Sequence, residues 1–109
     1  MILPALRSAA PNAEIIVTGA PDTFVNALAF TDPLYQSFNS SVAEAASAER
    51  VQFADPFPVF NPQGDLTAEV QAICTLTLLC AQNDGHPSDA GYRALADLIF
   101  DASEYSRLQ

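Results

Sequence analysis

The sequence of residues 1–109 predicts a single α/β domain with a short parallel sheet. Two short apolar runs, 13–19 and 51–55, are typical of buried strands. The residues between them, 32–49, repeat apolar side chains at helical spacing. Strand, helix and strand in this order form a βαβ unit, in which the two strands are parallel and the crossover is nearly always right-handed.

The segment before this unit is expected to be a short amphipathic helix over residues 2–10, which ends near Pro11 and Asn12. It lacks the basic start, the longer apolar core and the small-residue cleavage site of a secretory signal. If the protein is exported, we expect its signal to lie outside this chain. The stretch 20–33 is rich in Pro, Asp and Asn, and predicts an irregular loop with up to one turn of helix.

The central helix is expected to begin at Asp32 and Pro33, because Asp is a good N-cap and Pro a good first helical residue. It should run to about Glu49 and carry one apolar face. That face consists of Leu34, Phe38, Val42 and Ala45.

The second half of the chain begins with a loop, since residues 56–66 contain three prolines and a glycine. A short helical piece is expected over 67–73. The clearest element is the last helix, for which Ser88 is the candidate N-cap. Its apolar stripe is formed by Tyr92, Leu95, Ala96 and Ile99.

The charge balance excludes some partners. The chain has four Arg, no Lys and 13 acidic residues, which gives a net charge of −9. We therefore expect neither nucleic acid nor an anionic membrane surface as a partner. No apolar run approaches the ~20 residues that a membrane-spanning helix needs.

Cys74 and Cys80 lie six positions apart in a predicted loop. They can form a local disulfide, which would indicate an oxidising compartment, or they can remain two buried thiols among Leu, Ile and Thr. Two Cys and one His are too few for a closed zinc site. Metal-dependent chemistry is therefore a weak alternative, and we expect no cofactor.

The only histidine lies in the segment NDGHPSDAGY, residues 83–92. A nearby carboxylate can orient an imidazole that acts as a general base, and Asp84 stands two positions before His86. Pro87 restricts His86 to an extended backbone at a loop–helix junction. The same residue types are also usual in turns and helix caps, so the spacing equally fits an ordinary helix entry.

A longer stretch, DGHPSDAGYRALAD, resembles the last sequence block of the SGNH (GDSL-type) hydrolase superfamily, where a catalytic Asp and His precede the C-terminal helix. LPALRSAAPNAEIIVTG is similar to the helix and fourth strand of that fold, and ERVQFADPFPVF to the fifth strand and the following loop. ICTLTLLC resembles a paired-cysteine loop of some bacterial, secreted-type members. The resemblance thus covers nearly the whole chain. It implies the C-terminal half of a flavodoxin-like three-layer sandwich, a Cys74–Cys80 disulfide and a secreted or extracytoplasmic location.

The resemblance also implies an activity, carboxylic-ester hydrolysis by Ser-His-Asp acyl transfer on a small ester substrate. His86 matches the general base and Asp84 its carboxylate partner. The spacing departs from the common family pattern, in which the Asp stands three positions before the His, because Asn83 occupies that position here. Asp89 is better explained as a first-turn charge that complements the helix dipole.

The nucleophile that this mechanism needs is missing from the chain, which has neither a G-D-S nor a G-x-N-D block. None of its serines is expected at a Gly-flanked strand-to-helix turn. These serines are Ser8, Ser37, Ser40, Ser41, Ser47, Ser88, Ser103 and Ser106. We expect another chain, such as a complementing N-terminal half, or an oligomer to supply the nucleophile, unless the chain is a truncated form of the enzyme.

Two further expectations follow. Phe24, Phe57 and Phe60 lie in predicted loops and either line an acyl or aryl pocket or pack in the core. Two parallel strands alone leave sheet edges and a face uncovered, so a dimer or higher homo-oligomer is expected. The alternative to an enzyme is a non-catalytic α/β module that associates through its open sheet edge.

Overall fold

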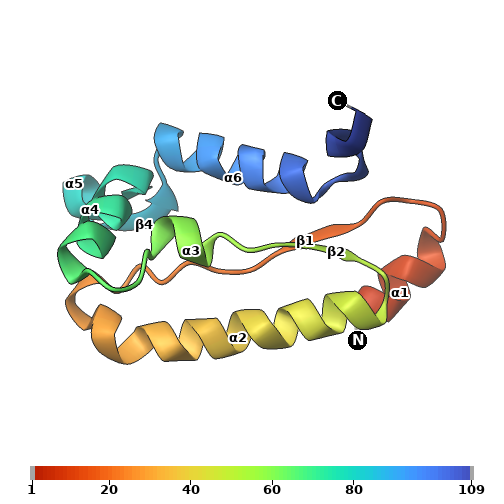
Figure 1. The fold of residues 1–109 in the computed structure, drawn as a ribbon, viewed down its shortest axis with the longest axis horizontal. Helices are drawn as coiled ribbons and strands as arrows, with labels where there is room; N and C mark the ends of the chain where they lie inside the picture. Colours follow the sequence, from red (N-terminus) through yellow and green to blue (C-terminus); the bar gives the residue numbers. More distant parts are fainter. Residues whose placement is uncertain (1, 109) are drawn as a thin grey trace.

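The computed structural model describes residues 2–108 as a mixed α/β protein (Figure 1). Its parallel sheet consists of β1 (Ile16–Thr18) and β2 (Gln52–Ala54), which are joined by α2 (Leu28–Ala48). The strands lie between α2 on one side and α6 (Asp89–Ala102) on the other. The expected βαβ unit is confirmed, although both strands are shorter than predicted.

The parallel pairing leaves one edge of β1 open. Ile16 is paired with Gln52 and Thr18 with Ala54. The amide of Gln52 donates to the carbonyl of Ile15, and the amide of Gly19 donates to the carbonyl of Ala54, each at 2.9 Å. Backbone hydrogen bonds point to alternate sides of a strand from one residue to the next. Ile16 and Thr18 therefore direct their backbone groups away from β2, to an edge of β1 that no strand within residues 2–108 covers.

The N-terminal helix is confirmed as α1 (Ile2–Ala9). Arg7 fastens this helix to both strands. Its guanidinium donates to the carbonyl of Ala13 at 2.7 Å, just before β1, and to the carbonyl of Arg50 at 2.9 Å, just before β2. One side chain of α1 therefore satisfies backbone oxygens in the segments before both strands.

The start of α2 differs from the prediction. A 3-10 turn, η1 (Val25–Ala27), leads directly into the helix at Leu28, so Asp32 and Pro33 lie inside it rather than at its N-terminus. The reason is tertiary, because the carboxyl of Asp32 is buried and accepts a hydrogen bond from Gln63. Pro33 has no N–H to donate to the carbonyl of Ala29. Water can satisfy this carbonyl instead, because Ala29 is exposed.

The apolar faces expected on both long helices remain largely exposed. On α2, the exposed fractions of Leu34 and Phe38 are 67% and 54%. On α6, Tyr92 and Ile99 are exposed, and Leu95 is half-buried. The helical spacing identified real apolar stripes, but the rest of residues 2–108 covers them only in part.

The segment 56–66 is not only a loop, because α3 (Phe57–Phe60) forms within it. Phe57 and Phe60 are both buried and belong to the core. The next helix, α4 (Leu66–Leu76), is longer than expected and starts at Asp65, whose carboxylate accepts hydrogen bonds from the amides of the first turn.

The region around the cysteines also differs from the predicted loop. Here β3 (Thr77–Leu78), α5 (Leu79–Gln82) and β4 (Asp84–Pro87) follow one another, and β3 pairs antiparallel with β4. The Cys74–Cys80 disulfide is confirmed and joins α4 to α5, with the two Cα atoms 5.1 Å apart.

After β4, α6 begins at the expected N-cap Ser88, and the chain continues into η2 (Glu104–Leu108). Within residues 2–108, no helix has the length and apolar character needed to cross a membrane.

Candidate functional site

Asp84 and His86 contact each other in β4, a strand rather than the expected loop–helix junction. One carboxylate oxygen, Asp84 Oδ1, accepts the backbone N–H of His86 at 3.0 Å and lies 2.5 Å from the ring nitrogen Nδ1. A spacing of two residues therefore suffices for the carboxylate to orient the imidazole. The left-handed backbone of Asn83, with φ of 53°, ends α5 and starts this strand.

The hydrogen bonds from His86 favour the ionised form of Asp84. The backbone N–H and then the ring of His86 hold the pKa of Asp84 below its usual value. Asp84 is therefore a carboxylate through the neutral and mildly acidic range.

The other ring nitrogen of His86, Nε2, makes no hydrogen bond to residues 2–108, and 77% of the His86 side chain is exposed. An imidazole held at Nδ1 by a carboxylate and open at Nε2 can accept a proton from a substrate or a nucleophile.

His86 lies at the rim of a depression of about 360 Å³. The depression lies at the carboxyl end of β1, the usual position of sites in open parallel sheets. Its walls are mostly apolar. Besides Asp84, Gly85 and His86, they are formed by Thr18, Gly19, Pro21, Pro56, Phe60, Thr77, Pro87 and Leu95.

No serine lines this depression among the described residues. Ser88 is close in sequence, but its hydroxyl donates to the carbonyl of Thr75 at 2.7 Å and accepts the amide of Gly91 at 3.2 Å. Ser88 is thus engaged as a helix cap. The hydroxyl of Thr77 is likewise engaged, because it donates to the carbonyl of Ile73 at 2.6 Å.

Two buried asparagines that the sequence did not single out hold the loop after β1. Asn39 of α2 makes paired hydrogen bonds with the backbone of Ala20, at 2.8 and 2.9 Å. Asn61 makes the same pair with the backbone of Asp22, both at 2.8 Å. The loop is thereby fixed next to β4. Asparagines are common in turns, so no sequence signal distinguishes these two.

The phenylalanines divide between the two expected roles. Phe60 is fully buried and also lines the depression beside His86, whereas Phe57 is buried in the core and borders a different hollow beside α2. Phe24 is exposed and borders a separate hollow next to Cys80.

No group of three or more His, Cys, Asp or Glu within residues 2–108 is arranged to hold a metal ion. No protein-family model, no curated protein and no solved structure matched the chain.

Proposed function

We propose that this chain supplies the general base and the orienting carboxylate of an SGNH-type carboxylic-ester hydrolase. The observation that carries the proposal is the contact of 2.5 Å between Asp84 Oδ1 and His86 Nδ1, with Nε2 open beside an apolar depression. The family resemblance of residues 84–97 supports it, as does the arrangement of helices on both sides of a parallel sheet, which suits a flavodoxin-like sandwich.

In this mechanism His86 Nε2 takes the proton of a serine hydroxyl as its oxygen attacks the ester carbonyl, and then gives that proton to the leaving alcohol. Water repeats the sequence on the acyl-enzyme and releases the acid. Asp84 keeps the proton of the neutral ring on Nδ1 and stabilises the transient imidazolium. The serine and the oxyanion donors come from another polypeptide segment, either a complementing N-terminal half or a second copy of the chain.

The proposed function also implies a cellular compartment for the protein. The Cys74–Cys80 disulfide is compatible with a secreted or extracytoplasmic, oxidising environment.

Ester hydrolysis by the purified chain tests the proposed function. With short-chain p-nitrophenyl esters, we expect hydrolysis by the homo-oligomer, in which a second copy of the chain supplies the serine. This hydrolysis should be lost in His86→Ala, because the base is then absent. The matched control is Asp101→Asn on the exposed surface of α6, which should keep the wild-type rate. A fluorophosphonate probe followed by mass spectrometry should label the serine that supplies the nucleophile.

Two results would contradict the proposal. Hydrolysis that persists in His86→Ala would show that the Asp84–His86 pair is not the catalytic base. Absence of both hydrolysis and a labelled serine, if a complementing N-terminal half does not restore hydrolysis either, would favour a non-catalytic module.

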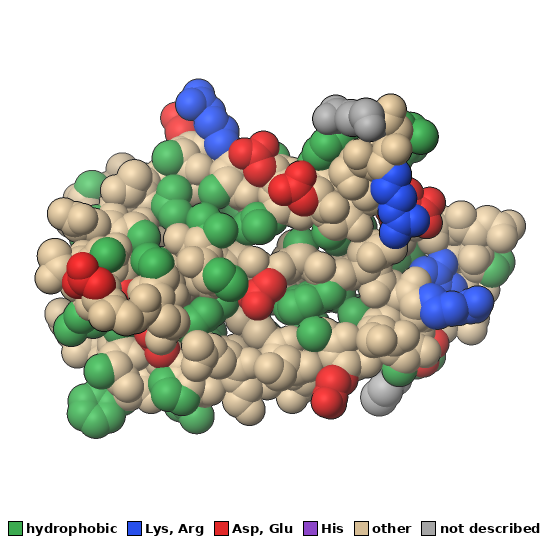
Figure 2. Space-filling model, viewed as in Figure 1, with side chains coloured by type: hydrophobic (Ala, Val, Ile, Leu, Met, Phe, Trp, Pro, Cys, Tyr) green, Lys and Arg blue, Asp and Glu red, His purple; other side chains and the backbone are tan. Residues whose placement is uncertain are grey.

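The second candidate, a non-catalytic module that associates with a partner, rests on uncovered apolar surface. α1, β1 and α2 enclose an almost entirely apolar groove of about 400 Å³, and one edge of β1 is open. Phe30, Leu34 and Phe38 are exposed along α2. Figure 2 shows hydrophobic side chains on the surface over several elements. Open edges and contiguous apolar surface are both typical of association sites.

Self-association is expected under either candidate. In sedimentation velocity, the chain should run as a dimer or larger species, and the double variant Leu34→Ser/Phe38→Ser should shift it toward the monomer because it removes exposed apolar surface. The matched control is Tyr105→Ser, an exposed aromatic residue on η2. A monomeric wild type with a cooperative thermal transition would refute this expectation.

A further inference from the structure

Three carboxyl groups meet in the interior near the start of α2. Asp22 comes from the loop after β1, Asp32 from α2 and Glu69 from α4, and their exposed fractions are only 0%, 5% and 4%. The carboxyls of Asp22 and Glu69 lie close enough to that of Asp32 to affect its pKa. Three ionised carboxylates in such a place would lose hydration and repel one another.

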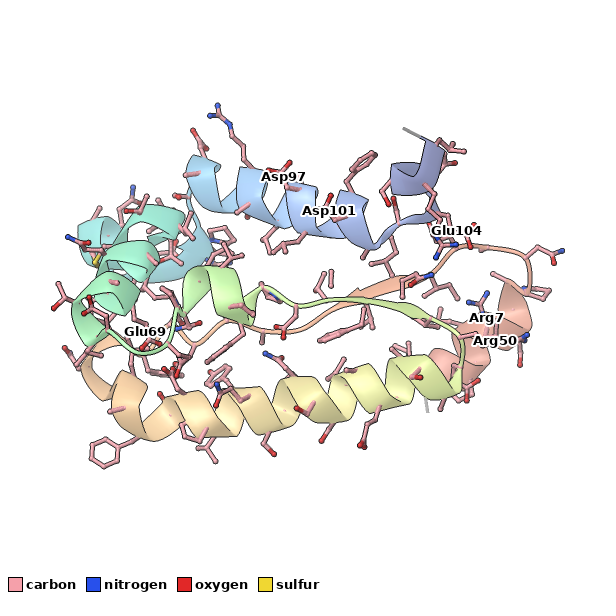
Figure 3. The ribbon with its side chains drawn as sticks, viewed as in Figure 1. Arg7, Arg50, Glu69, Asp97, Asp101 and Glu104 are labelled. Atoms are coloured by element: carbon pink, nitrogen blue, oxygen red, sulfur yellow. A yellow bond between two sulfur atoms is a disulfide. The ribbon has the colours of Figure 1, made fainter. Side chains whose placement is uncertain are left out.

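No cation neutralises this carboxyl cluster, which we define as Asp22, Asp32 and Glu69. The only ion pair among residues 2–108 is that of Asp84 and His86. Figure 3 shows Arg7 and Arg50 at the opposite end of the molecule from Glu69. Tyr35 of α2 is the other titratable side chain next to the cluster, and burial followed by the charge of Asp22 raises its pKa.

The neutral donors around the cluster do not satisfy every oxygen. Asp22 accepts from the amide of Phe24 at 3.0 Å and from the hydroxyl of Thr31. The side-chain amide of Asn61 donates to Glu69 at 3.0 Å.

Asp32 is the exception. Gln63 Nε2 donates to Asp32 Oδ2 at 3.0 Å, but the buried Asp32 Oδ1 has no donor among residues 2–108. Native proteins rarely leave a buried polar oxygen unpaired. A proton on one of the adjacent carboxyls would supply the missing hydrogen bond.

We propose that Asp22 and Asp32, packed against Glu69, form a proton-binding site that holds a shared proton at neutral pH and makes the stability of this end of the fold depend on pH. Burial raises the pKa of both Asp22 and Asp32, and the neighbouring carboxyl of Glu69 raises that of Asp32 further. The inference stands apart from the proposed hydrolase function, since none of the three residues lines the depression beside His86.

The carboxyl cluster is linked to the strand that carries His86. The backbone of Asp22 is held by Asn61, which also donates to Glu69. Thr23 follows Asp22 in this loop. Its hydroxyl oxygen lies 3.3 Å from the position that a Cβ on Gly85 of β4 would occupy. The cluster therefore supports the wall next to His86.

The direction of the pH effect follows from linkage. A carboxyl whose pKa is higher in the folded state binds its proton more tightly there than in the unfolded chain. Its stabilising contribution is complete below the unfolded pKa and is lost as the pH rises through the folded pKa. The folded state should therefore lose stability as the pH rises above the ordinary range of carboxyl groups.

The test is thermal unfolding of the chain between pH 4.5 and 8 in buffer with a chelator. Asp32→Asn places an NH₂ group at the position of the unpaired oxygen and keeps an oxygen for Gln63. We expect this variant to raise the Tm by about 5 °C at pH 8 and by much less at pH 4.5. Asp97→Asn, exposed on α6, removes the same charge and should leave the pH dependence of the wild type unchanged.

Infrared spectroscopy of the wild type keeps the proposal testable if Asp32→Asn does not fold. At neutral pH we expect the C=O band of a protonated carboxylic acid, which is absent from exposed carboxylates, and it should disappear as the pH is raised. Its absence at neutral pH would overturn the proposal. Equal shifts of Tm in Asp32→Asn and Asp97→Asn at every pH would overturn it as well.

Discussion

Gly91→Ala is expected to destabilise the chain by about 3 kcal/mol or more, or to prevent folding, although alanine is the better helix former. Gly91 is buried in the first turn of α6. A Cβ at this position would lie 1.9 Å from the carbonyl oxygen of Leu76 and 3.0 Å from Cβ of Pro87. The carbonyl cannot move aside freely, because it accepts the amide of Ser88 at 2.9 Å.

The sign of this effect separates two explanations. Helix propensity alone would make Gly91→Ala more stable by about 1 kcal/mol, whereas the close contact makes it less stable. Denaturant unfolding of the variant decides between them. Ala90→Gly, at the exposed neighbouring position, is the matched control and should lose at most about 1 kcal/mol. A Gly91→Ala protein as stable as the wild type would show that α6 does not pack as described.

The parts of the fold that could be predicted are those with a repeated local pattern. The crossover helix α2 and the two apolar runs beside it specify the βαβ unit, and Ser88 specifies the start of α6. The pairing of β3 with β4 was missed because strands of two and four residues are too short to show alternation. The start of α2 was wrong because Asp32, a good cap by its chemistry, is used in the interior instead.

In the candidate site, too, some residues could be predicted from the sequence and others could not. Asp84 and His86 could be named from sequence because their interaction spans two residues of one strand. The residues that support the site could not, since Asn61 and Asp22 are 39 positions apart and meet only when the chain is folded. Exposure was also unpredictable, because periodicity marks an apolar face but does not say what covers it.

Asp84→Asn is expected to lower the kcat of ester hydrolysis about 10²- to 10³-fold, a prediction that rests on the proposed function. In a triad whose Asp contacts only the ring, an Asn can turn its NH₂ toward Nδ1 and hold the imidazole in the wrong tautomer, with a loss of about 10⁴-fold. Here the same oxygen, Asp84 Oδ1, also accepts the backbone N–H of His86 at 3.0 Å. That bond favours the oxygen of an Asn at this position, so the tautomer is kept and only the stabilising charge is lost.

The comparison of Asp84→Asn with Asp84→Ala tests this reasoning, because alanine removes the charge and the orienting oxygen together. Asp84→Ala should therefore be slower than Asp84→Asn, by about tenfold or more if its loss reaches the ~10⁴-fold of a disrupted triad. Asp89→Asn, an exposed acidic residue three positions after His86, should keep the wild-type kcat. Equal rates for the Asn and Ala variants would mean that the bond from the His86 backbone does not control the orientation of this side chain.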